Sequence, residues 1–178
     1  MTITPETQDW TWTIGKRCPD CGYDGPSFDV LKTGDAIRAL IDPFCVALAK
    51  PNASTRPNGE TWAPVEYACH VRDVFRLYES RLGLMLNEDN PTYPNWDQDA
   101  TAIEERYDLQ DPSTVATELA EAGHSLANAF DRVTGDQWQR TGVRSDEKNF
   151  TVATFATYMV HDPFHHLWDI VGSPLSDR

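Results

Sequence analysis

Apolar side chains recur every three or four residues in four segments of the chain. These segments span about residues 35–49, 64–86, 112–133 and 151–171, and Asp111 supplies a typical cap ahead of the third. The spacing places the apolar side chains of each segment on one face of an α-helix. No convincing period-two pattern of a strand interrupts them. The pattern therefore predicts an all-α fold, a four-helix bundle.

The remaining segments are expected to be connections. Pro43 is expected to kink the first helix, because proline supplies no backbone donor. Residues 87–111 are rich in Asp, Asn and Pro, with one short helix expected at about 102–106. Residues 1–28 show no helical periodicity. We therefore divide the chain into an N-terminal arm (1–28) and a bundle (29–178).

The amino-acid composition indicates which kinds of partner the protein is not expected to bind. The chain has 178 residues, 40% of them hydrophobic, and a formal net charge of −13. Its 15 basic residues are scattered, whereas proteins that bind nucleic acid cluster Lys and Arg against phosphates. Neither nucleic acid nor a membrane surface is an expected partner. The polar, acidic N-terminus does not resemble a signal peptide, so a cytoplasmic location is expected.

Histidines gather near the C-terminus. Three of the five fall in the run 161–166, next to Asp162, and imidazole and carboxylate are ordinary ligands of zinc. Helical phase, at about 100° per residue, turns Asp162 and His166 toward the apolar face and makes His161 and His165 the less buried pair. A bulge at Pro163 would exchange the two pairs. A divalent metal, zinc first, is the predicted ligand.

A third ligand is expected from the second helix. His70 lies on its apolar stripe, so its ring points into the bundle, where an unpartnered imidazole costs free energy. Glu66 and Asp73, one turn to either side, are candidate acceptors for its other ring nitrogen. Three protein ligands leave a fourth position for water or substrate, which is typical of catalytic rather than structural zinc.

Two motifs resemble the DinB-like superfamily. Residues 62–73 resemble its second helix, in which a tryptophan and an acid precede a metal-binding histidine, and residues 150–170 resemble the end of its fourth helix. The resemblance covers about residues 30–172. It implies a four-helix bundle whose metal, often zinc or nickel, is held by one histidine of the second helix and an i,i+4 pair on the fourth. The superfamily includes mycothiol-dependent maleylpyruvate isomerase and other thiol-dependent S-transferases.

The resemblance leaves the i,i+4 pair open. In the family, the second ligand of the fourth helix is commonly followed three residues later by Gln or Asp and then by an apolar residue, and Asp169 and Ile170 have this spacing from His166. That match selects Asp162 and His166. Matching from the His-Asp end of the motif selects His161 and His165 instead. Pro163 departs from the family pattern.

The arm carries a second candidate motif. Cys18-Pro-Asp-Cys21-Gly22 has the form of a zinc knuckle, which needs two further ligands. His161 and His165 would complete a Cys2His2 site if the arm folds over the fourth helix. Two free thiols in an ordered arm are the simpler alternative.

The predicted function follows from the open metal position. We expect a metal-dependent thiol S-transferase or isomerase, with zinc, nickel or iron(II) as the ion and a low-molecular-weight thiol of the mycothiol type as cosubstrate. A metal-dependent hydrolase and a non-catalytic, metal-stabilised bundle that binds a small ligand or protein are the alternatives. Arg72, Arg76 and Arg144 are available for a substrate carboxylate, and Trp62 and Trp168 for a pocket wall. Whether the chain forms a homodimer stays open.

Overall fold

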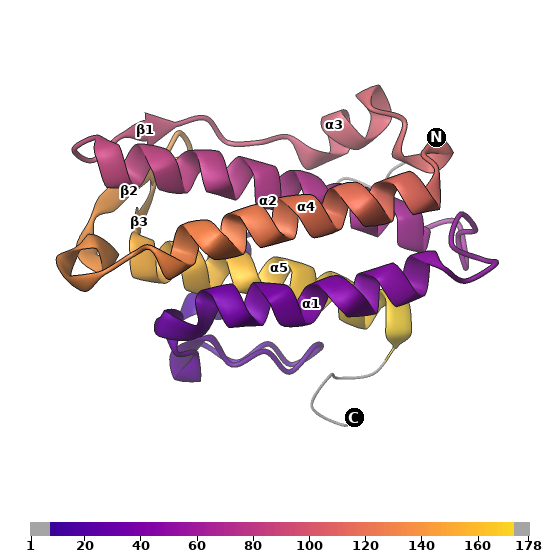
Figure 1. The fold of residues 1–178 in the computed structure, drawn as a ribbon, viewed down its shortest axis with the longest axis horizontal. Helices are drawn as coiled ribbons and strands as arrows, with labels where there is room; N and C mark the ends of the chain where they lie inside the picture. Colours follow the sequence, from indigo (N-terminus) through magenta and orange to yellow (C-terminus); the bar gives the residue numbers. More distant parts are fainter. Residues whose placement is uncertain (1–7, 173–178) are drawn as a thin grey trace.

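The computed structural model describes residues 8–172, and four long helices run side by side through it (Figure 1). They are α1 (Thr33–Leu48), α2 (Pro64–Asn87), α4 (Pro112–Asp131) and α5 (Val152–Val171). Helices α1 and α2 each pack against both α4 and α5, which gives the cyclic order α1–α4–α2–α5. The predicted four-helix bundle is confirmed, and the four predicted segments match these helices to within two residues at each end.

Local hydrogen bonds set where the helices begin. The Asp111 carboxylate accepts from the N–H of Thr114 at 2.9 Å, and the Thr151 hydroxyl accepts from the N–H of Thr154 at 3.1 Å. Both side chains satisfy a backbone donor that has no partner within its own helix. The α2 helix begins at Pro64, whose missing N–H costs nothing in the first turn.

The apolar stripes of the helices meet in one core. Phe44 of α1, Phe75 of α2, Leu126 of α4 and Phe155 of α5 are all essentially inaccessible to solvent. Large side chains buried in this way provide most of the free energy that holds helices together.

A small sheet closes one end of the bundle, where no strand was expected. It consists of β1 (Thr92–Tyr93), β2 (Thr141–Arg144) and β3 (Lys148–Thr151), with β2 parallel to β1 and antiparallel to β3. Strands of two to four residues are too short for an alternating pattern to be visible in the sequence. The short helix α3 is also displaced, since it spans Gln98–Glu104 rather than 102–106. The sheet places Arg144 beside α5.

The N-terminal arm folds onto α5. Its described part contains two short 3-10 helices, η1 (Trp10–Ile14) and η2 (Gly25–Ser27), which both contact α5, and a third, η3 (Val30–Lys32), leads into α1. The Tyr23 hydroxyl donates to the carbonyl of Thr157 at 2.9 Å. Residues 1–7 of the arm and 173–178 of the bundle lie outside the described residues. Within residues 8–172, no helix combines the length and apolar character needed to cross a bilayer.

Candidate metal centre

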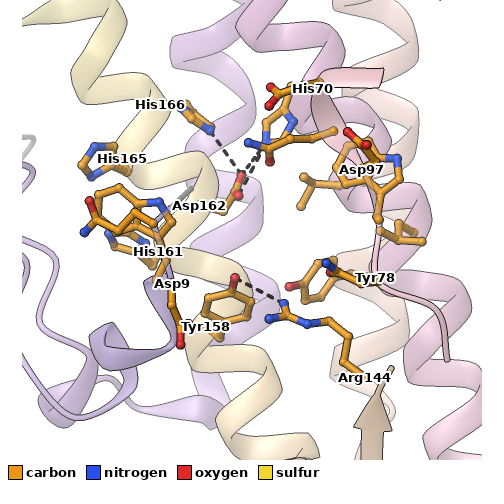
Figure 2. Close-up of a pocket in the computed structure, with 18 of the residues that line it drawn as sticks. Asp9, His70, Tyr78, Asp97, Arg144, Tyr158, His161, Asp162, His165 and His166 are labelled. Carbon is orange, nitrogen blue, oxygen red and sulfur yellow. Dashed lines mark hydrogen bonds and ion pairs between the residues drawn. The ribbon is translucent and has the colours of Figure 1, made fainter. Parts of the chain in front are cut away.

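Seven side chains with metal-binding chemistry form two clusters on different faces of α5. In each cluster the donor atoms all lie within 4.8 Å of one another. Figure 2 shows the α5 members of both clusters around one cavity. The inner cluster consists of His70, Asp162 and His166, and the outer cluster of Cys18, Cys21, His161 and His165.

The inner cluster joins α2 to α5 through one carboxylate. Nε2 of His70 lies 3.2 Å from Oδ1 of Asp162, and Nε2 of His166 lies 3.8 Å from the same oxygen (Figure 2). Nδ1 of His166 lies 2.9 Å from Oδ2 of Asp169. Asp169 therefore orients this ring so that Nε2 faces the cluster, as carboxylates that support metal-binding histidines do.

Aromatic rings enclose His70. Its side chain is only 1% exposed, and Trp96 stacks on it with ring centroids 5.3 Å apart. Trp62 meets its edge at 6.1 Å. In the part of the chain that the structure describes, Nδ1 of His70 has no hydrogen-bond partner. A buried polar atom of this kind costs free energy that a neighbouring interaction has to offset.

The prediction that Glu66 or Asp73 accepts a hydrogen bond from the other ring nitrogen of His70 is wrong. The buried Glu66 carboxylate instead pairs with Arg56, at 2.5 and 2.7 Å, and accepts from the N–H of Ala63 at 2.8 Å. Asp73 pairs with Arg72 and accepts from the hydroxyl of Tyr107 at 2.5 Å. The two acids point away from His70 because stronger cationic and helix-terminal donors engage them.

The charge of Asp162 is stabilised by its neighbours. Burial by itself raises the pKa of this carboxyl group, but the imidazoles of His70 and His166 outweigh that effect and hold the pKa below its usual range. Asp162 is therefore a carboxylate at neutral pH, the form that can bind a cation. Its side chain is 33% exposed toward the cavity.

The outer cluster joins the arm to α5. Sγ of Cys18 lies 3.6 Å from Nδ1 of His165. Both cysteines are fully buried, and His161 and His165 are 3% and 9% exposed. The expectation that these histidines form the less buried pair is wrong, because the arm covers the face of α5 that helical phase turns away from the bundle. Trp10 is part of this cover, 5.3 Å from the ring of His161 and 4.8 Å from that of His165.

Burial keeps His161 and Cys21 of the outer cluster uncharged. It lowers the pKa of His161 to about 4, with a further contribution from His165, and it raises the pKa of Cys21 to about 12. At neutral pH the imidazole is therefore neutral, with a lone pair to donate. The thiol of Cys21 loses its proton only when a positive charge is close.

Helix α5 continues through Pro163 without a change of phase. It is α-helical from Val152 to Val171. Its two pairs of candidate ligands face the two sides expected for a helix without a bulge at Pro163. The alternative in which a bulge exchanges the two pairs is not observed. His70 meets Asp162 and His166, whereas His161 and His165 face the cysteines.

A cavity of about 990 Å³ opens beside the inner cluster. Of the three arginines considered for a substrate, only Arg144 lines it; Arg72 is buried in contacts with Asp73 and Glu118, and Arg76 lies against the same acids. Arg144 lies at the end of the cavity away from His70, beside Tyr158 (Figure 2). Trp62 lines the cavity as expected, while Trp168 instead packs on His165 at 5.4 Å.

Several residues of the cavity wall were not predicted from the sequence, among them the aromatic residues Trp10, Trp96 and Tyr158. Trp96 and Trp10 lie in segments without helical periodicity, so nothing in the pattern indicated where their rings point. Tyr158 lies on α5 one turn before Asp162, and its helical phase could have placed it on the cavity side. These residues show that the arm and the connection before α3 both contribute to the site.

Comparison with known proteins places the fold. The structure is similar to that of YfiT from Bacillus subtilis, described as a probable metal-dependent hydrolase with an unusual four-helix bundle topology. The TM-score is 0.68 at 19% sequence identity, over 80% of this chain and 82% of that one. No curated protein matches the chain in sequence. The sequence model of the DinB superfamily matches residues 34–170, which contain all four long helices except the ends of α1 and α5, and the chain therefore belongs to the DinB superfamily.

Proposed function

We propose that the chain is a metal-dependent enzyme whose inner cluster holds one divalent ion, zinc first among candidates. The observation that carries the proposal is the convergence of three donor atoms at the wall of a large cavity. Donors of a tetrahedral zinc site, each about 2.0–2.2 Å from the ion, lie about 3.3–3.6 Å from one another. The separations of 3.2 and 3.8 Å in the inner cluster bracket that range.

The position of the cluster favours a catalytic role over a structural one. Three protein ligands would leave one position of a tetrahedral ion open, and all three ligands line the cavity. A divalent ion there would act as a Lewis acid that lowers the pKa of a thiol or of water toward neutrality. Asp169 orients His166, and Trp62 and Trp96 restrict the access of water to His70. Nickel and iron(II) suit the same donors.

We further propose that the nucleophile is a low-molecular-weight thiol of the mycothiol type, used in S-transfer or isomerisation. The volume of the cavity supports this choice, because 990 Å³ lies at the upper end of the range for small-molecule sites and accommodates a thiol together with its acceptor. Arg144 lies at the end of the cavity remote from the inner cluster, where Asp146 pairs with its Nε and one terminal nitrogen, and it is the residue we assign to a substrate carboxylate.

Hydrolysis is the second candidate. It is supported by the similarity of the fold to that of YfiT, described as a probable metal-dependent hydrolase. Both reactions need the same inner cluster and differ only in the nucleophile, so activity assays separate them.

The test starts from protein purified without chelator. Metal content is measured by mass spectrometry for the wild type, for His70→Ala and for His124→Ala, a control at an exposed histidine of α4. We expect His70→Ala to lose one equivalent of metal, because it removes one of the three donors, and His124→Ala to lose none. Unchanged metal content in His70→Ala would overturn the proposed site.

Activity then identifies the nucleophile. Wild-type protein is assayed for metal-dependent consumption of low-molecular-weight thiols with the electrophile monochlorobimane, and for hydrolysis of p-nitrophenyl acetate without thiol. Thiol consumption that His70→Ala abolishes and His124→Ala retains supports the S-transferase. Hydrolysis alone supports the second candidate, and a fully metal-loaded protein inactive in both assays contradicts an enzymatic role in favour of a metal-stabilised binding protein.

A further inference from the structure

The outer cluster is separate from the inner cluster and has its own donor chemistry, although His161 and His165 also line the cavity. It brings together two sulfur and two imidazole donors from segments about 140 residues apart in sequence. All four side chains are buried or nearly so, and four protein donors would fill a tetrahedral site and leave no position for a substrate. Closed sites with four protein ligands of this kind are typical of structural zinc.

The measured distance fits a tetrahedral ion. With a Zn–S bond of about 2.3 Å and a Zn–N bond of about 2.0–2.1 Å, sulfur and nitrogen ligands lie about 3.5 Å apart. Sγ of Cys18 and Nδ1 of His165 are 3.6 Å apart. A hydrogen bond between a thiol and an imidazole has a similar separation, so this pair is placed either for that bond or for joint binding of an ion.

An unpartnered polar atom points to a ligand independently of that distance. Nε2 of His161 is fully buried, and no hydrogen-bond partner for it exists among residues 8–172. A second orphaned ring nitrogen in so small a region would cost free energy in a protein that lacked the ion. A cation that accepts the lone pair of His161 removes this cost.

The backbone around the cysteines is shaped as a knuckle. The N–H of Cys18 donates to the carbonyl of Tyr23 at 2.8 Å, and the N–H of Gly22 donates to the carbonyl of Cys18 at 3.0 Å. Gly22 has φ of +80°, a conformation that residues with a Cβ rarely adopt. The turn holds both sulfur atoms on the side that faces α5, and all four cysteines of the chain are free thiols in the described structure.

We propose that the outer cluster binds a structural zinc ion that fastens the N-terminal arm to α5. Zinc binding releases the two thiol protons to solvent and leaves two thiolates that neutralise the ion. The arm held in this way supplies Asp9 and Trp10 to the wall of the cavity, and Asp9 reaches β3 through Lys148 at 2.7 Å. The zinc ion thus completes the cavity without contacting a substrate.

The shared helix couples this ion to the inner cluster. His161 precedes Asp162 and His165 precedes His166, so the two ligand pairs alternate along one turn of α5. An ion on the outer pair fixes the rotation of the helix about its axis, and that rotation sets the direction of the inner pair. The proposal does not depend on the proposed function, because each cluster has its own variants.

The test uses His70→Ala protein, in which the inner cluster is disabled. X-ray absorption at the zinc edge is expected to show two sulfur and two nitrogen scatterers. After replacement of zinc by cobalt, a sulfur-to-cobalt charge-transfer band is expected in the near ultraviolet. A zinc-edge spectrum with no sulfur scatterer, the absence of bound zinc, or a Cys18–Cys21 disulfide in protein purified under reducing conditions would overturn the proposal.

Cysteine variants locate the ion. Cys21→Ser in the otherwise unaltered chain is expected to lose the charge-transfer band and one equivalent of zinc while it retains the metal that depends on His70. Cys45→Ser, at a half-buried cysteine of α1, is the matched control and is expected to change neither. Trypsin should also cleave Cys21→Ser faster after the exposed Lys16 and Arg17, because the arm is released. Unaltered zinc content and cleavage rate in a folded Cys21→Ser protein contradict the proposal.

Discussion

At the scale of single residues, adjacent positions of α5 serve different sites. One step along an α-helix turns the side chain by about 100°, which sends His161 to the arm and Asp162 to the cavity. Asp169 lies close to both clusters, since Oδ2 is 2.9 Å from Nδ1 of His166 and Oδ1 is 3.9 Å from Nε2 of His165. A short segment of helix therefore carries both proposed functions, and point substitutions can separate them.

The role of Asp169 can be measured as metal affinity. Asp169→Ala removes the carboxylate that orients His166, and we expect the affinity of the inner cluster to fall about 10- to 100-fold, as loss of such supporting partners typically does. Competition with a chromophoric chelator measures the change. Glu121→Ala, at an exposed acid of α4, is the control for lost negative charge and is expected to keep wild-type affinity.

Arg144 is expected to bind the carboxylate of a substrate. A hydrogen bond to a charged group contributes about 1.5–3 kcal/mol, so Arg144→Met should weaken the binding of small dicarboxylates such as maleate at least tenfold in calorimetry. Arg76→Met removes a charge of the same kind from a half-exposed side chain outside the cavity. An equal loss of dicarboxylate affinity in the two variants would show that only the net charge of the protein affects binding, and would contradict a specific role of Arg144.

At the scale of elements, the long helices follow from the sequence and the arm does not. Spacing by three and four, the Asp111 cap and Pro64 predicted the four helices, and helical phase predicted that Asp162 and His166 meet His70. The burial of His161 was predicted only under the Cys2His2 alternative, because the covering arm has no periodicity from which its path can be inferred. For the same reason Trp96, in the irregular connection before α3, was not placed in the site.

The path of the arm depends on one close approach. A Cβ on Gly25 would lie only 2.0 Å from the backbone carbonyl oxygen of Thr13. Gly25→Ala should therefore displace η1 from η2, accelerate tryptic cleavage after Lys16 and Arg17, and lower the melting temperature. A backbone atom cannot rotate away as a side chain can, so the strain has no local relief.

Gly83 provides a matched comparison for Gly25→Ala, because the space beside it is open. Gly83 lies within α2, and a Cβ there would meet no atom within 4 Å. Gly83→Ala is expected to raise the free energy of unfolding by about 0.5–1 kcal/mol, because alanine loses less backbone entropy in a helix. Denaturant unfolding measures both variants, and we expect the free energy of unfolding to fall in Gly25→Ala and to rise in Gly83→Ala.

At the scale of the whole molecule, bound metal should contribute to stability. An ion that binds only the folded chain stabilises it by RT ln(1 + [L]/Kd), about 2.7 kcal/mol at a concentration of 100 Kd. Chelation should lower the melting temperature, and added zinc should restore it. We expect this response to shrink in Cys21→Ser and to shrink further when His70→Ala is added. An identical melting temperature with and without chelator in the wild type contradicts both sites.

Anomalous diffraction at the zinc edge would locate an ion at the inner cluster. In a crystal of protein purified without chelator, we predict an anomalous peak within bonding distance of His70, Asp162 and His166, which are the donors that converge at the cavity. In the same crystal we predict a second anomalous peak between the donor atoms of the outer cluster. A crystal of zinc-saturated protein with no anomalous peak at the inner cluster would contradict the proposed metal-dependent function.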